Sequence, residues 1–294
     1  MQSSQNILLG TAALSVGILV VSAVMNRDAP RAGRMRRLAD ALFSKAGGSG
    51  AAVVHGLPFV PAPELREVGA VTASGDRQFM SKRLYMQLRV LDLATNQTVA
   101  EFAQLLKAAM AARPYVLYRE ALTSNGVGLL TWSEDPSFFV NDLNGVLESL
   151  KNLFVERVGW TMFGKTYSNG HEKDLDEFLF KKPIRAAQNE KWDWAIWYPL
   201  KRRGPFYIQP AADQCRMLLA HAGIGKSFAD VGAAHDIRLK CFGIDPLDNE
   251  YVIGLCGDDV HNLSRVVEEM RKTQHTAEFL ERLGPFFVGK KINE

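Results

Sequence analysis

The sequence predicts an α+β protein made of two ferredoxin-like βαββαβ units, preceded by one transmembrane helix. A series of apolar patterns typical of strand, helix, strand, strand, helix and strand occurs twice along the chain. Residues 127–150 also align with residues 251–274, which sets Asp135 over Asp259. In addition, residues 7–25 carry no charged side chain. These observations indicate two units of the same fold that follow a membrane anchor in the sequence.

These patterns divide the chain into four parts. Residues 1–26 form the anchor, residues 27–76 a linker, residues 77–172 the first unit and residues 173–294 the second. The linker begins with a short helical run, after which glycines and prolines interrupt any regular element. A free linker of this composition would be mobile, whereas an ordered one would lie against a partner surface.

The anchor is predicted from hydropathy and from the charges around it. As a helix, residues 7–25 would span about 28 Å, close to the thickness of a bilayer core. No basic side chain precedes them, unlike in a secretory signal, which favours a retained anchor over a cleaved targeting segment. Arginines follow within residues 27–37, so the positive-inside rule places the C-terminal part on the cytoplasm-like side, whether cytosol, stroma or matrix. Membrane lipid is therefore an expected partner of this single-pass protein.

The elements of the first unit follow from the spacing of apolar residues. A period of two predicts half-buried strands, and a period of three to four predicts amphipathic helices. The turn at Ser124, Asn125 and Gly126 predicts a hairpin. In order, the elements are a strand at 83–91, a helix at 98–112, a hairpin of 115–122 and 127–132, a helix from Asp135 and a strand within 153–163.

The second unit repeats this order. Its elements are a strand at 192–200, a helix at 211–227, strands at 237–244 and 251–256, a helix at 260–273 and a strand near the C-terminus. Pro210 can begin the first of these helices, because a first-turn residue needs no intrahelical N–H bond. Met217, Leu218, His221 and Gly225 then share one helix face. By chemistry alone, a histidine on an apolar face is more often a hydrogen-bonded core residue than a ligand.

Composition excludes several classes of protein. The chain has 294 residues, of which 47% are hydrophobic and 23% charged, and its net charge is +3. These values suit a globular protein with a sizeable core, and no basic field predicts a nucleic-acid partner. Cys215, Cys241 and Cys256 form no Cys-x-x-Cys pair, which argues against a zinc site or a disulfide framework.

Three stretches of the second unit form a more specific pattern. They are Tyr-Pro-Leu-Lys from Tyr198 with Tyr-Ile-Gln-Pro from Tyr207, the helical run at 217–228, and the ending Leu-Gly-Pro-Phe-Phe-Val-Gly from Leu283. Together with Gly-Ile-Asp from Gly243, they resemble the chlorite dismutase family, most closely its coproheme decarboxylase branch. This resemblance implies that the sheets of the two units join into a dimeric α+β barrel with helices outside.

The resemblance also implies a cofactor, either haem b or coproheme. His221 matches the iron ligand of the family, a role for which neutral imidazole is suited. Thr276 matches a propionate-binding serine. Gln274 stands where related sequences often carry a carboxylate near the ligand, and a neutral amide there would make the histidine less imidazolate-like.

Catalytic residues are implied in the same way. Tyr198 matches the tyrosine that coproheme decarboxylases use as a radical relay to a propionate; the alternative is a packed strand aromatic. Lys201 or Arg202 matches the neighbouring basic residue, which would hold a carboxylate. The sequence leaves the choice between these two cations open.

The residues expected on the side of the cofactor opposite His221 differ from those of the family. Counting from His221 places the distal residue at Ala234, whereas counting back from Gly243 places it at Asp236. Neither is arginine, and Arg238 lies two residues further along. Little or no chlorite decomposition is therefore expected, because a cation is needed to hold the anionic oxidant.

Two functional hypotheses follow. The first is a membrane-anchored haem or coproheme protein, either a weak peroxide-dependent coproheme decarboxylase (an oxidoreductase) or an inactive relative that carries or senses haem. The second is a non-catalytic accessory subunit of a photosynthetic or respiratory membrane complex, with the barrel as its interaction module. A membrane-protein complex or a homo-oligomer is the expected assembly.

Overall fold

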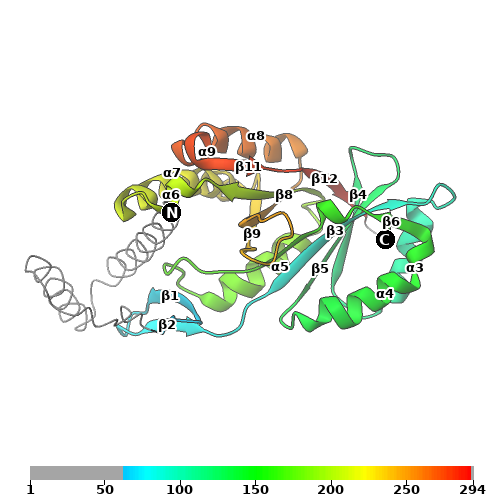
Figure 1. The fold of residues 1–294 in the computed structure, drawn as a ribbon, viewed down its shortest axis with the longest axis horizontal. Helices are drawn as coiled ribbons and strands as arrows, with labels where there is room; N and C mark the ends of the chain where they lie inside the picture. The colour runs from blue at the N-terminus through cyan, green and yellow to red at the C-terminus, as the bar shows by residue number, and fades with distance from the viewer. Residues whose placement is uncertain (1–61, 293–294) are drawn as a thin grey trace, which may run out of the picture. The chain divides into compact units, whose positions relative to one another are not determined.

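Within residues 62–292, which this computed structural model describes, ten strands form one antiparallel sheet (Figure 1). They are β3 (Tyr85–Leu93), β4 (Tyr115–Glu120), β5 (Gly126–Ser133), β6 (Phe154–Glu156), β7 (Met162–Lys165), β8 (Trp194–Arg202), β9 (His235–Lys240), β10 (Tyr251–Gly257), β11 (Leu280–Leu283) and β12 (Phe287–Lys291). Their order is β10-β9-β7-β3-β5-β4-β12-β8-β11, with β6 beside β3. A further pairing of β10 with β8 closes this sheet into a barrel.

Helices separate the strands in the predicted order. In the first half they are α3 (Val99–Met110) and η1 (Phe139–Leu143) with α4 (Asn144–Ser149). In the second half they are α6 (Gly204–Tyr207), α7 (Ala211–Asp230), α8 (Val260–Arg271) and α9 (Gln274–Phe279). The α+β class and both strand-helix series are thus confirmed. Residues Glu64–Tyr207 and Arg216–Glu294 belong to one compact unit.

The two halves meet at two seams. At one seam, β12 pairs with β4, and Gly289, Lys290 and Lys291 lie opposite Glu120, Arg119 and Tyr118 in that order. At the other, β7 and β9 pair only at Lys165 with Lys240. There, α5 (Lys182–Gln188) packs along β9, and both α5 and η4 (Glu177–Lys181), which precedes it, place apolar side chains against the barrel core. The segment that connects the halves therefore fills the weaker seam.

Large aromatic side chains fill the barrel interior. Trp197 and Phe287 are fully buried there, beside Tyr118, together with aliphatic residues from both halves. Two glycines make room for the rings: a β-carbon on Gly254 would lie 2.7 Å from the Trp197 ring, and one on Gly128 would lie 2.4 Å from that of Phe287. Glycine is needed at these two points because an aromatic ring lies directly against the strand backbone.

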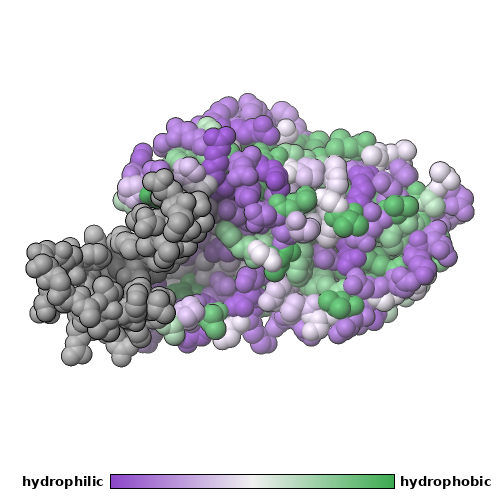
Figure 2. Space-filling model, viewed as in Figure 1, coloured by the Kyte–Doolittle hydropathy of each residue, from purple (hydrophilic) through white to green (hydrophobic). Residues whose placement is uncertain are grey.

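The outer faces of the barrel are covered by helices. α3 and α4 bury a cluster that includes Phe102 and Leu106 against the first half. α8 buries Leu263 and Val266 against Tyr198 and its apolar neighbours in the second half. The outward side of α8 bears ion-paired charges, and Figure 2 shows mainly hydrophilic residues over this part of the surface. This polar-out, apolar-in division is what the helical period predicts.

A partly buried ion-pair network connects three strands of the first half. Arg157, which follows β6, binds Asp92 at 2.5 Å and Glu120 at 2.7 Å. The Glu120 side chain is 0% exposed, so Arg157 compensates a charge that water cannot reach. The Thr123 hydroxyl donates a further hydrogen bond to Glu120.

Several observed elements were not predicted, among them α6, α9 and β11. A hairpin of β1 (Glu67–Val71) and β2 (Arg77–Met80) begins within the predicted linker, and η4 with α5 was not predicted. Among residues 62–292, no helix combines the length and apolarity that a membrane span requires. The predicted anchor at residues 7–25 and the helical run at 35–43 lie outside the described residues.

Candidate functional site

His221 lies on the half-buried face of α7. Met217 is buried and His221 partly buried on this face, as the helical period predicts. Its Nδ1 lies 3.4 Å from the hydroxyl of Thr276 on α9, and no described residue forms a hydrogen bond with its Nε2. Burial, followed by the charges of Arg202 and Arg238, lowers the pKa of His221 to about 4. The imidazole is therefore neutral at physiological pH, which leaves one nitrogen able to act as a ligand.

A second histidine packs against the first. His275, on α9, is 2% exposed, and its ring centre lies 5.1 Å from that of His221 in an edge-to-face arrangement. The Nε of Arg202 donates a hydrogen bond of 2.9 Å to Nε2 of His275. A nitrogen that accepts from arginine carries no proton, so neutral His275 is protonated on Nδ1. Arg202 thereby fixes one tautomer in the wall beside His221.

The structure separates the two candidate cations on β8. Lys201 forms ion pairs with Asp248 at 2.6 Å and with Glu281 at 3.7 Å, close to solvent. Arg202 instead contacts His275, because successive side chains of a strand point to opposite faces. Only Arg202 therefore belongs to the His221 cluster, and the role of Lys201 stays a prediction.

The side chain of Arg202 has neutral partners only. Besides His275, its guanidinium donates to the hydroxyl of Tyr251 at 3.0 Å and stacks on the rings of Tyr251 and Phe206. Among the described residues, no carboxylate lies within ion-pair distance of this side chain. A partly buried charge without a counter-charge is costly, so this position favours an anionic ligand group.

The sheet beneath the site carries a row of functional groups. On β9, Ile237 and Leu239 face the barrel interior, so Arg238 faces outward. Arg238 is in register with Ile253 of β10, which is in register with Tyr198 of β8. Arg238 and Tyr198 therefore stand on the same outer face, two strands apart.

Tyr198 is buried without a polar partner. It is 4% exposed, and its ring packs on Phe286 with centres 4.8 Å apart. No described residue forms a hydrogen bond with its hydroxyl. Burial raises the pKa of Tyr198 well above its usual value, so the side chain stays a neutral phenol.

The two remaining predicted residues, Thr276 and Gln274, also lie in different surroundings. Thr276 reaches His221, whereas the side chain of Gln274 points to solvent and donates to Glu278 at 3.0 Å. His275 lies beside His221, where Gln274 was predicted. His275 directly follows Gln274 in the sequence, so the prediction missed the residue beside His221 by one position. The chain has only six histidines, which was the one feature of the sequence that could have indicated His275.

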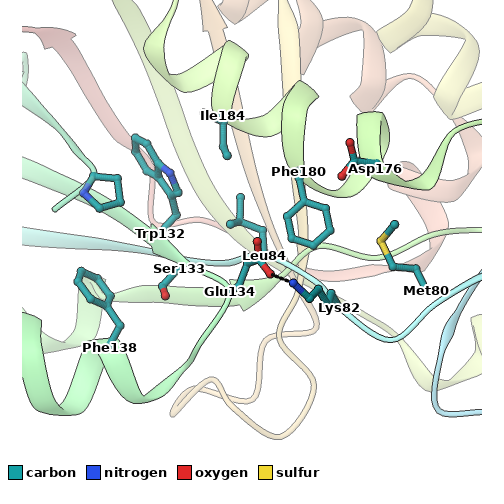
Figure 3. Close-up of a pocket in the computed structure, with 11 residues that line it drawn as sticks. Met80, Lys82, Leu84, Trp132, Ser133, Glu134, Phe138, Asp176, Phe180 and Ile184 are labelled. Atoms are coloured by element: carbon teal, nitrogen blue, oxygen red, sulfur yellow. Dashed lines mark ion pairs between the residues drawn. The ribbon is translucent and has the colours of Figure 1, made fainter. Parts of the chain in front are cut away.

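A cavity of about 430 Å³ lies elsewhere in the barrel. Figure 3 shows Phe180 and Ile184 from the connecting segment facing Trp132 of β5, with an ion pair of Lys82 and Glu134 beside them. No residue of the His221 cluster lines this cavity. It is therefore separate from the predicted site.

The fold and the site define a class: closed α+β barrels with a histidine-bearing helix over the outer face of the sheet. Residues 97–292, more than half of the chain, match the sequence profile of the family described as chlorite dismutase. The chain belongs to the chlorite dismutase family.

Solved structures share this fold. A haem-binding protein from Thermus thermophilus has a TM-score of 0.59 at 17% identity, over 72% of this chain and 92% of that chain. Chlorite dismutase from Candidatus Nitrospira defluvii, in complex with imidazole, has a TM-score of 0.56 at 11% identity, over 71% and 91%. At these identities, the likeness supports the fold alone.

Proposed function

We propose that this protein binds an iron porphyrin, haem b or coproheme, with His221 as the iron ligand. The observation that carries the proposal is the neutral His221 imidazole, whose Nε2 has no partner among the described residues. Family membership and the haem-binding neighbour support the same cofactor. An absorption spectrum of the protein with added haem tests it. A protein without a Soret band would favour the accessory-subunit hypothesis.

The residues around His221 fit such a cofactor. The side chain of Arg202 has no ion-pair partner among the described residues and suits a propionate carboxylate, and the hydroxyl of Tyr198 has no hydrogen-bond partner among them. Thr276 accepts from the Nδ1 of His221 when Nε2 is the ligand nitrogen, which orients the ring. When bound, the porphyrin supplies an iron centre that reacts with peroxide; the protein supplies the ligand, the orientation and the charge balance.

Replacing Arg202 with methionine is expected to weaken haem binding by about 10- to 100-fold. The change removes both the expected propionate partner and the hydrogen bond that fixes His275, and loss of such outer contacts costs this much in metal sites. Haem transfer to apomyoglobin measures the dissociation rate. Lys201→Met is the matched control, because it removes the neighbouring cation from the other face and should change the rate less than about twofold. Equal effects of both variants would contradict the assignment of Arg202.

Decarboxylation of coproheme is a second candidate function, favoured by the unpartnered hydroxyl of Tyr198. We expect slow or absent conversion of coproheme to haem b with peroxide, and loss of any conversion in Tyr198→Phe. Phenylalanine keeps the packing on Phe286 but lacks the O–H whose hydrogen a radical relay must give up. Mass spectrometry of the porphyrin measures the product, with Tyr85→Phe, on the first half, as the control. Undiminished conversion in Tyr198→Phe would remove this residue from the site.

A further inference from the structure

The cavity beside Trp132 lies between two walls that the fold holds in place separately. On the wall from the first half, the N–H of Leu84 donates to the hydroxyl of Thr166 at 2.9 Å, and the N–H of Thr166 donates to the carbonyl of Leu84 at 2.8 Å. On the wall from the connecting segment, Lys182 of α5 donates to Asp236 of β9 at 2.8 Å. Both walls are therefore fixed, and the volume of about 430 Å³ between them is in the range of small-molecule sites.

Aromatic rings from both walls line this cavity. Trp132 and Phe138 belong to the first half, and Phe180 belongs to the connecting segment (Figure 3). The aliphatic side chains of Leu84 and Ile184 lie beside the rings. Aromatic side chains attract a further ring in stacked or edge-to-face contact. The lining therefore favours a flat ligand with an apolar ring system.

One polar group of the lining has no partner. Trp132 is only 4% exposed, and its indole N–H forms no hydrogen bond with any described residue. An indole nitrogen can only donate, so the group that satisfies it must be an acceptor. A buried donor without an acceptor is costly, and a carbonyl oxygen of a ligand in the cavity would remove that cost.

The charged side chains at the cavity are already paired. Lys82 lies 3.0 Å from Glu134, and Asp176 lies 2.7 Å from Lys181. All four side chains are more than half exposed, so both ion pairs lie in solvent. An ionised ligand group would thus lose its hydration in the cavity without gaining a counter-charge. The ligand should therefore be neutral.

We infer that this cavity is a second ligand site, which takes a neutral, flat molecule of the aromatic ketone or quinone class and donates the indole N–H of Trp132 to its carbonyl oxygen. The site shares no residue with the His221 cluster, so the inference goes beyond the proposed porphyrin binding and does not depend on it. Its ligand would contact both β5 and the connecting segment. Binding would thereby join the two parts of the chain beside the seam where β7 and β9 pair at one position.

The test is calorimetric titration of the full chain, without added haem, with four probes built on one two-ring skeleton. Indanone is neutral and carries a carbonyl, whereas indane lacks it; aminoindane and indane carboxylate carry opposite charges. Indanone should bind about threefold to tenfold more tightly than indane, which is the effect of one net hydrogen bond. Both charged probes should bind more weakly than indanone by at least about tenfold.

Three variants locate the binding site of the probes. Trp132→Phe keeps a ring but removes the donor, and it should reduce the ratio of indanone to indane affinity to about one. Trp194→Phe, on β8 and away from the cavity, is the matched control and should leave this ratio unchanged. Ile184→Trp fills the cavity and should weaken both neutral probes by more than about tenfold, with circular dichroism as the check on folding.

A spectroscopic measurement on the wild type answers the question even where Ile184→Trp does not fold. The indole N–H signal of Trp132, assigned by its loss in Trp132→Phe, should shift with indanone and shift less with indane in proton–nitrogen correlation spectra. An unmoved signal at saturating indanone would overturn the inference.

Other outcomes also decide against this site. Equal wild-type affinity for indanone and indane would remove the role of the Trp132 N–H. An unchanged preference in folded Trp132→Phe, or unchanged binding in folded Ile184→Trp, would place the probe elsewhere. Tighter binding of a charged probe would contradict the neutral ligand. A missing Soret band, by contrast, would overturn the proposed function and leave this inference standing.

Discussion

Replacing His221 with alanine is expected to remove the Soret band and to lower haem affinity by more than about 100-fold. Alanine is a good helix former, and the site is only partly buried, so α7 should persist. The loss follows from the ligand itself, because among the described residues no group of three or more histidine, cysteine or acidic side chains could hold the metal instead. The measurement is a haem titration followed at the Soret maximum.

A matched histidine separates ligation from general effects. His261 is exposed on α8, and His261→Ala should leave the spectrum and the haem affinity unchanged. Circular dichroism of both variants checks that the helices remain. An unchanged Soret band in folded His221→Ala would place the iron ligand elsewhere and would make His275, 5.1 Å away, the next residue to replace.

Replacing Arg157 with methionine should lower the free energy of unfolding by about 3–5 kcal/mol. The variant leaves Glu120 as a buried charge without its cation, and it also frees Asp92. Methionine keeps most of the length of the arginine side chain, so the change acts mainly through charge. Urea unfolding followed by circular dichroism measures the difference.

Two controls test the cause of this loss. Adding Glu120→Gln should restore part of the stability, because the uncompensated charge is then removed. Lys151→Met breaks an ion pair with Glu148 in which both side chains are largely exposed, and it should cost less than about 1 kcal/mol. Equal losses from Arg157→Met and Lys151→Met would mean that the buried network contributes no more than a surface pair.

Much of the fold was predictable because burial is periodic. The alternation over residues 83–91 and the three-to-four spacing over 98–112 gave elements that the structure places at Tyr85–Leu93 and Val99–Met110. The hairpin β1–β2 was missed, because its strands of five and four residues are too short to show a clear alternation. The packing of η4 and α5 at the β7–β9 seam was also missed. It depends on how few residues of β7 and β9 pair with each other, which no local sequence pattern indicates.

The site was predictable to a smaller extent. His221 and Tyr198 carried a recognisable pattern, and both lie on the second half beneath or beside its helices. The choice between Lys201 and Arg202 depends on the face of β8 from which each side chain projects. The alignment with the family did not fix which of the two neighbouring cations occupies the matching position. His275 was missed because its role depends on contacts with Arg202 and His221, more than fifty residues away in sequence.

The position of β12 has a consequence for the order of folding. This last strand pairs with β4 of the first half and β8 of the second, and just before it Phe286 packs on Tyr198 while Phe287 enters the barrel core. The pairing of β12 with β4 joins residues that lie far apart in the sequence, and such long-range pairings form slowly because the entropy of loop closure opposes them. Barrel closure and completion of the Tyr198 surroundings thus depend on the same slow, long-range pairing.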